Sequence, residues 1–174
     1  MDEEFSVFVA ARSPHLYRSA YLLTTSAQSA EDLVQSALTK AYAAWWRVRK
    51  ADDPVAYVHG IVIKTFLSDR RKRSSTELPV ADTPDVVRHE DPAQRVALIE
   101  ALRTLGDIDR GVVVLRFWED LSVADTAAAL GLSPAAVKNR SLRALRALRH
   151  ELGEPPGEPT DEARMTDHTP WRRR

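Results

Sequence analysis

The sequence predicts an all-α protein with two small helical domains joined by a flexible linker, the second containing a helix-turn-helix. Three observations support this fold class. Ala, Leu, Val and Arg dominate, and only 6 of 174 residues are glycine, a composition that favours helices. Apolar residues recur at spacings of three and four, without the alternation typical of strands. A segment with three prolines, 74–92, interrupts this periodicity and divides the chain.

The N-terminal domain is expected to cover residues 1–73 and to form four helices around one small core. Ser13 is a plausible N-cap with Pro14 at the first helical position, and Pro54 follows Asp53 in the same way. The third helix is expected to start near Ser26 or Ser29. The expected helices span about 3–11, 13–23, 26–47 and 54–73.

The C-terminal domain is expected to cover residues 93–152, again with four helices. Ser122 and Ser133 are suitable N-caps, and Asp125 completes a capping box with Ser122. Gly131 can take the left-handed conformation that ends a helix. The expected helices span about 92–104, 107–118, 122–130 and 133–150.

The remaining segments carry no packing signal. The linker 74–92 is expected to be flexible, and the tail 153–174, rich in Pro, Gly and charge, to be disordered. The absence of cysteine excludes disulfides and cysteine nucleophiles. No apolar run approaches the roughly 20 residues that span a bilayer, and the N-terminus is acidic rather than basic. We therefore expect a cytoplasmic protein without membrane insertion.

The last two helices of the C-terminal domain form a candidate helix-turn-helix. The final helix has a buried stripe at Val137, Ala144 and Leu148, with Leu142 and Leu145 beside it. Its other faces carry cations that can neutralise phosphates or contact base edges. A solvated amphipathic helix with basic residues near its C-terminus is the alternative. These polar residues are Lys138, Asn139, Arg140, Arg143 and Arg146.

Two basic stretches stand out in the N-terminal domain, which carries 11 Lys and Arg against 8 Asp and Glu. Trp45 and Trp46 are followed by cations, a combination suited to single-stranded nucleic acid, although either tryptophan could belong to the core. The run 70–73 is entirely basic and could hold a phosphate backbone; a charged domain boundary is the alternative.

Patterns typical of enzymes are missing, since the sequence contains no phosphate-binding Gly-rich loop, H-E-x-x-H or G-x-S-x-G. We therefore expect neither catalysis nor a cofactor. The histidines lack metal-ligand spacing and are expected at the surface or at helix ends, so no metal site is expected. They are His15, His59, His89, His150 and His168.

Two long segments together resemble bacterial RNA polymerase sigma factors of the extracytoplasmic-function (ECF) class, in the SigE-like actinobacterial branch. The N-terminal match is HLYRSAYLLT…AEDLVQSALTKAYAAWWRVR…DDPVAYVHGIVIKTFLSDRRKR. The C-terminal match is LRTLGDIDRGVVVLRFWEDLSVADTAAALGLSPAAVKNRSLRALRALR. They cover most of residues 5–150. The D-L-V-Q helix combined with the basic fourth helix is the specific part of the match.

The resemblance implies partners and roles for particular residues. It implies binding to core RNA polymerase through the β′ clamp helices and the β flap, and to promoter DNA, with an anti-sigma factor as a further candidate. Polymerase docking falls on Asp32, Leu33, Val34 and Gln35. Capture and melting of the −10 element fall on Trp46, Arg49, Lys50, Tyr57, His59, Lys64, Arg70 and Arg71. Recognition of the −35 duplex falls on Lys138, Asn139, Arg140 and Arg143.

The sequence departs from the family pattern at several positions. Lys64 stands where Asn is usual, and Ala135-Ala136 replace a common Gly-Thr or Gly-Ser. The segment 106–109, Gly-Asp-Ile-Asp, replaces the usual Leu-Pro before the motif, where Asp107 is expected to cap the helix. These departures bear on the promoter sequence rather than on the overall role.

An alternative function is a helix-turn-helix transcriptional regulator whose N-terminal bundle senses a ligand or dimerises. That protein would bind duplex DNA unaided as a stable homodimer. A sigma factor would instead be a monomer that needs core polymerase. A helical adaptor without DNA contact would leave the basic clusters unexplained.

Overall fold

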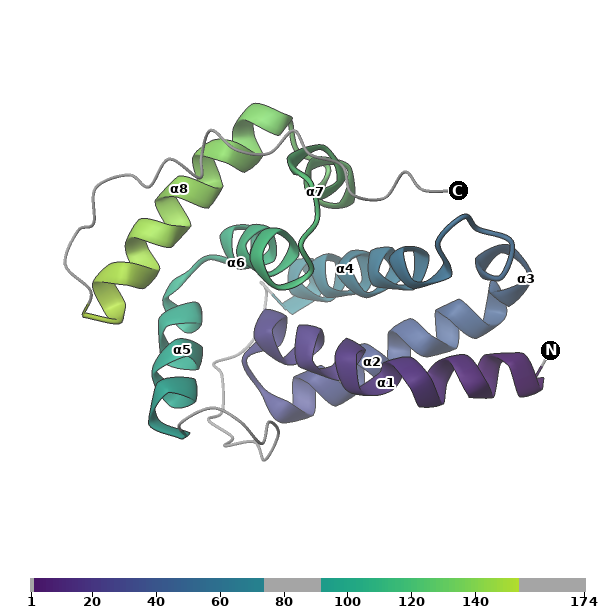
Figure 1. Ribbon diagram of the computed structural model, residues 1–174. Coiled ribbons are helices and arrows are strands. Elements are labelled where there is room, and N and C mark those ends of the chain that lie inside the picture. The colour runs from purple at the N-terminus through teal and green to yellow at the C-terminus, as the bar shows by residue number, and fades with distance from the viewer. Residues whose placement is uncertain (1, 74–91, 154–174) are drawn as a thin grey trace.

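The computed structural model describes residues 2–73 and 92–153, which are entirely helical apart from short connections (Figure 1). No strand occurs among these residues, so the all-α prediction is confirmed. The expected flexible linker, except for Pro92, and the expected disordered tail, except for Gly153, lie outside the described residues. The elements are α1 (Asp2–Thr24), α2 (Ala27–Ala43), α3 (Trp45–Val48), α4 (Pro54–Arg73), α5 (Pro92–Thr104), α6 (Asp107–Val113), the π-helix η1 (Val114–Trp118), α7 (Val123–Leu130) and α8 (Pro134–Glu151).

The first helix differs from the sequence-based prediction. Two helices were expected to meet at Ser13, but α1 runs without interruption through Pro14. A proline inside a helix removes the hydrogen bond to the carbonyl four residues earlier, here that of Ala10. Ala10 and Pro14 are both exposed, so water can take the place of the missing donor. The prediction of a break at Ser13 was therefore wrong.

The predicted third helix is divided in the structure. Ser26 is its N-cap, because its hydroxyl accepts a hydrogen bond from the amide of Ser29 at 3.4 Å. The helix α2 stops at Ala43, and Ala44 leaves the helical region with φ −104° and ψ 14°. The short α3 then places Trp45 in the core. The break at Ala44 is thus followed directly by a buried aromatic ring.

The helix expected at 107–118 begins as an α-helix and ends as a π-helix. The amide of Glu119 bonds to the carbonyl of Val114 at 3.0 Å, five residues back. The N-cap of α6 is Gly106, which makes no side-chain cap bond, so the expected cap at Asp107 was wrong. Asp107 is instead the first helical residue, where a carboxylate still complements the helix dipole.

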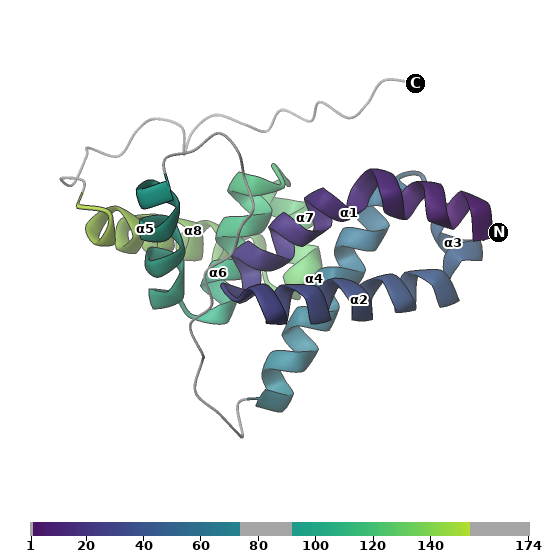
Figure 2. The same cartoon turned by 90° about the horizontal axis from the view of Figure 1, so that it is seen from below.

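The two helical domains pack against each other. In both views α5 and α8 lie at one end of the molecule and α3 at the other, with α6 between α8 and the N-terminal helices (Figures 1 and 2). One buried cluster joins Leu16, Val58 and Phe66 of the N-terminal domain to Leu115 and Val137 of the C-terminal domain. The hydrophobic core therefore crosses the domain boundary.

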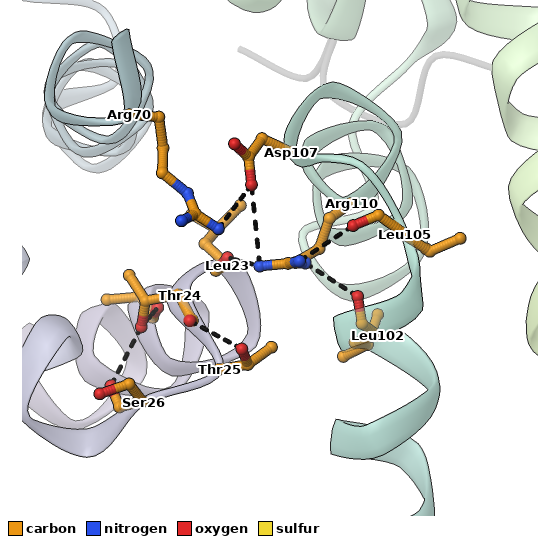
Figure 3. A network of polar contacts seen from close by, with 10 residues as sticks. Leu23, Thr24, Thr25, Ser26, Arg70, Leu102, Leu105, Asp107 and Arg110 are labelled. Atoms are coloured by element: carbon orange, nitrogen blue, oxygen red, sulfur yellow. Dashed lines mark hydrogen bonds and ion pairs between the residues drawn. The ribbon is translucent and has the colours of Figure 1, made fainter. Parts of the chain in front are cut away.

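A buried arginine ties the two domains together (Figure 3). The guanidinium of Arg110 in α6 donates to the carbonyl of Leu23 at the end of α1, at 2.9 Å. It also donates to the carbonyls of Leu102 and Leu105, each at 2.9 Å, where α5 ends. Burial lowers the pKa of Arg110 to about 10, and the nearby Arg70 guanidinium adds to that shift. The side chain therefore stays charged at neutral pH and satisfies carbonyls from both domains.

One carboxylate near Arg110, that of Asp107, also contacts the N-terminal domain. Asp107 Oδ1 lies 2.6 Å from the Arg70 guanidinium of α4 and 4.0 Å from that of Arg110. Both the Arg70 and Asp107 side chains are more than one third exposed, so this ion pair contributes little to stability.

Among the described residues, none of the helices is long and apolar enough to cross a membrane.

We predict that Arg110→Met lowers the free energy of unfolding by about 2–5 kcal/mol, because it leaves buried carbonyls without a donor. Urea denaturation followed by circular dichroism measures the change. Arg146→Met, at an exposed position of α8, is the matched control and should stay within about 0.5 kcal/mol of the unchanged protein. Equal stability of the two variants would contradict the role of Arg110 in joining the two domains.

Candidate nucleic-acid interface

The helix-turn-helix is built by local caps, as predicted. Ser122 caps α7 by accepting from the amide of Asp125 at 3.0 Å and donating to its carboxylate at 2.6 Å. Gly131 ends α7 with φ +66°, in the left-handed region that glycine adopts freely. Ser133 then caps α8 by accepting from the amide of Ala136 at 3.1 Å. The small Ala127 is buried where the helices meet.

The exposed face of α8 carries the residues predicted to contact the −35 element. Val137, Ala144 and Leu148 are buried as expected, whereas Leu142 is exposed. Lys138 and Asn139 are exposed in the first turns of α8. This face can therefore present cations and an amide to the edges of base pairs.

Two arginines of this face are paired within the domain. Arg140 and Arg143 each approach a different carboxylate oxygen of Asp109 at 2.6 Å. The Asp109 side chain is only 14% exposed, whereas that of Arg143 is 65% exposed. Asp109 therefore fixes the direction of both guanidinium groups while leaving most of Arg143 accessible. It belongs to the 106–109 segment that departs from the family pattern.

The tryptophan pair is split between core and surface. Trp45 is buried against Phe5 and Phe8 of α1. Trp46 is 53% exposed, and the guanidinium of Arg47 lies 4.6 Å from its ring centroid. The predicted −10 residues Arg49 and Lys50, which follow soon after in the chain, are exposed, as is Tyr57 of α4. An exposed indole with surrounding cations is the arrangement that stacks unpaired bases.

The predicted −10 residues on α4 differ in accessibility. Lys64 and Arg71 are exposed, and Arg70 is half-buried with its guanidinium on Asp107 of the other domain. The His59 side chain is only 12% exposed, with Nδ1 3.4 Å from the carboxylate of Glu119. His59 was expected at the surface or at a helix end, and this expectation is wrong, since the residue is largely covered inside α4. In this arrangement it is not available to DNA.

Burial also sets the protonation state of His59. Desolvation lowers the pKa of the imidazole, with the neighbouring carboxylate of Glu119 opposing the shift and His15 adding to it. The neutral ring is therefore favoured at neutral pH. Glu119 also accepts from His15 Nε2 at 2.9 Å, which joins α1, α4 and the end of η1. Sequence reasoning missed this cluster because no local spacing brings its members together.

The predicted polymerase-docking segment lies on α2 and presents two of its four residues. Asp32 and Gln35 are exposed, and the Asp32 carboxylate accepts a hydrogen bond from the side-chain Nε2 of Gln28 at 3.1 Å. Leu33 and Val34 are buried in the core. Only the polar pair can therefore contact a partner in this arrangement, while the apolar pair holds α2 in place.

Comparisons with known proteins match both halves of the chain. Residues 8–76 match the family described as Sigma-70 region 2, and residues 95–148 match Sigma-70, region 4. The RNA polymerase sigma-E factor of Streptomyces avermitilis is 38% identical over 152 residues, which cover 86% of this chain and 85% of that protein. The ECF RNA polymerase sigma factor SigM of Mycobacterium tuberculosis is 32% identical over 142 residues, covering 79% of this chain and 71% of that protein.

A solved structure has a similar fold over most of this chain. The sigma factor RpoE in complex with the anti-sigma factor NepR from Bartonella quintana matches with a TM-score of 0.73 and 26% sequence identity. The match covers 87% of this chain and 98% of that one, so it includes both helical domains. The relatives are transcription initiation factors rather than enzymes. The chain belongs to the sigma-70 family of bacterial RNA polymerase sigma factors, in the SigE-like branch of the ECF class.

Proposed function

We propose that this protein binds core RNA polymerase and directs it to promoters whose −10 element it melts and whose −35 element it recognises as duplex. The observation that carries the proposal is the exposed Trp46 with Arg47 over its ring. A platform for stacking unpaired bases is needed by a protein that opens DNA. A regulator that binds only duplex DNA has no use for it.

The −10 element is assigned to the surface around Trp46 and to α4. Trp46 and Tyr57 offer exposed rings for unstacked bases, at about 1–3 kcal/mol per stacked base. Arg49, Lys50, Lys64 and Arg71 supply exposed cations for the phosphate backbone. Stacking on the protein would offset the cost of separating the strands.

The −35 element is assigned to the exposed face of α8. Lys138, Asn139 and Arg143 face outward, and the support of α7 fixes the entry of this helix into a major groove. Arg140 and Arg143 keep a defined direction because Asp109 holds both guanidinium groups. A planar guanidinium can make a bidentate contact to guanine.

Polymerase docking is assigned to α2. Asp32 and Gln35 would contact the β′ clamp helices, and the buried Leu33 and Val34 would position them. The C-terminal domain would contact the β flap. Since these partners are parts of RNA polymerase, the protein would act in the cytoplasm.

The packed arrangement supports a further partner. His59 and Arg70 face the C-terminal domain, so their use in DNA binding requires the two domains to separate. The similar RpoE structure contains the anti-sigma factor NepR. An anti-sigma factor that holds this chain in the packed arrangement would keep it from the promoter.

Transcription with purified core polymerase, with and without this protein, tests the function. We expect promoter-dependent transcripts only when both are present, and a monomeric protein in sedimentation experiments. A homodimer that footprints duplex DNA without polymerase would support the alternative regulator and contradict the sigma function.

The docking role of α2 predicts that Asp32→Arg weakens binding to core polymerase by about 10-fold, which corresponds to roughly 1.4 kcal/mol. Reversal of one exposed charge at an interface replaces attraction by repulsion. Fluorescence anisotropy with labelled protein measures the affinity. Glu3→Arg makes the same charge change at an exposed position of α1 and should bind normally, so equal affinities of the two variants would refute the docking role.

The −35 role predicts that Arg143→Ala lowers initiation from a −35-dependent promoter, because loss of a bidentate base contact costs about 1–3 kcal/mol. Initiation assays at several protein concentrations measure the loss. Arg149→Ala removes the same charge near the end of α8 and should initiate normally. Unchanged initiation by Arg143→Ala would remove this residue from the DNA contact.

A further inference from the structure

Three side chains with metal-ligand chemistry meet where the two domains pack. His15 comes from α1, His59 from α4, and Glu119 directly follows η1. Each offers one ligand atom, and these three atoms all lie within 4.8 Å of one another. Two imidazoles and one carboxylate form a ligand set that zinc commonly uses. The proposed function uses neither His15 nor Glu119.

The spacing of the ligand atoms suits a small tetrahedral ion. Zinc bonds to nitrogen and oxygen of about 2.0–2.2 Å place neighbouring ligand atoms about 3.3 Å apart in a tetrahedron. His15 Nε2 lies 2.9 Å from Glu119 Oε2, and His59 Nδ1 lies 3.4 Å from Glu119 Oε1. These two distances end on different oxygens of Glu119. One carboxylate oxygen and the two nitrogens lie within 4.8 Å of one another, so side-chain rotations would bring them around one ion.

The charge of the cluster favours a cation. The Glu119 side chain is 9% exposed, and a buried carboxylate is costly unless a cation compensates it. Within the described residues, the side chains that contact its carboxylate are those of His15, His59 and Ser19. None of these is a lysine or an arginine, so no permanently charged cation bonds to the carboxylate among them.

Neighbouring residues hold the ligands in place. The backbone amide of Glu119 bonds to the carbonyl of Val114 in η1, and Ser19 of α1 donates a hydrogen bond to Oε1 of Glu119. Trp118 stacks on His15, with centroids 5.9 Å apart and planes 10° apart, and its Nε1 donates to Ser19 Oγ at 3.1 Å. Such supporting contacts orient metal ligands and raise the affinity of a site.

We propose that His15, His59 and Glu119 bind one zinc-like divalent ion that links α1 and α4 to the C-terminal domain. Three protein ligands leave the fourth position for water. Because the ligands come from both domains, the ion stabilises the packed arrangement by mass action. On the proposed function, which requires the domains to separate, metal binding would then hold the protein inactive.

Metal binding by the full-length chain tests the site directly. The protein is stripped with a chelator and titrated with Zn²⁺ by calorimetry, and with Co²⁺ to follow the visible absorption of a tetrahedral site. We expect one site. Loss of a residue that only supports a ligand weakens metal binding by about 10–100-fold. His15→Gln and Glu119→Gln remove ligands themselves and should weaken binding by at least as much. His15 is 44% exposed, so its substitution leaves the core intact.

The matched control is His150→Gln, which removes a histidine whose side chain is 88% exposed near the end of α8. It should bind Zn²⁺ with the same affinity as the unchanged protein. Zn²⁺ should raise the melting temperatures of both proteins by the same amount. Equal affinity in His15→Gln, Glu119→Gln and His150→Gln would overturn the site. Lack of zinc binding by the unchanged protein would overturn it as well, and would leave the cluster as hydrogen bonds alone.

Transcription assays separate this inference from the proposed function. Zn²⁺ should reduce initiation by the unchanged protein more than by His15→Gln or Glu119→Gln. An equal reduction in all three would refute the regulatory consequence, while the binding data would still establish the site. Absence of promoter-dependent transcripts without added Zn²⁺ would instead contradict the proposed function, whatever the metal affinity.

Discussion

The guanidinium of Arg110 is the contact on which the relation between the two domains depends. It satisfies carbonyls at the ends of α1 and α5 at once, and so fixes α6 against both. Helix ends normally leave carbonyls that need solvent or a cap. Here the guanidinium of Arg110 donates hydrogen bonds inside the core, so the carbonyls at the ends of α1 and α5 can be buried. The buried cluster that joins both domains then holds the π-helix and the helix-turn-helix that follow α6.

Local features of the fold were predictable from the sequence because their causes are local. Ser122, Ser133 and Gly131 act within three or four residues of their own positions, and all three behave as predicted. Pro14 misled the prediction because the cost of a missing donor depends on solvent access, which the sequence does not state. The π-helix, in contrast, was not predicted, because the helical periodicity of 107–118 does not distinguish an α-helical from a π-helical turn.

The candidate site was predictable where exposure follows from helical periodicity. Lys138 and Asn139 lie opposite the buried stripe of α8, as the spacing indicated. The contacts between domains were beyond such reasoning. His15 and Glu119 are 104 positions apart, and only the packed arrangement brings them to hydrogen-bonding distance. The same packing covers His59, which a family comparison alone assigns to DNA.

The core shared by the two domains also affects the tendency of the protein to aggregate. Separation would expose Leu115 of η1, Val137 of α8 and the faces of α1 and α4 that cover them. Apolar patches on separated domains promote association with other chains. The formal net charge of zero offers little electrostatic repulsion against such association. The packed arrangement therefore keeps these apolar side chains away from other chains, and an opened chain would need a partner that covers the same surface.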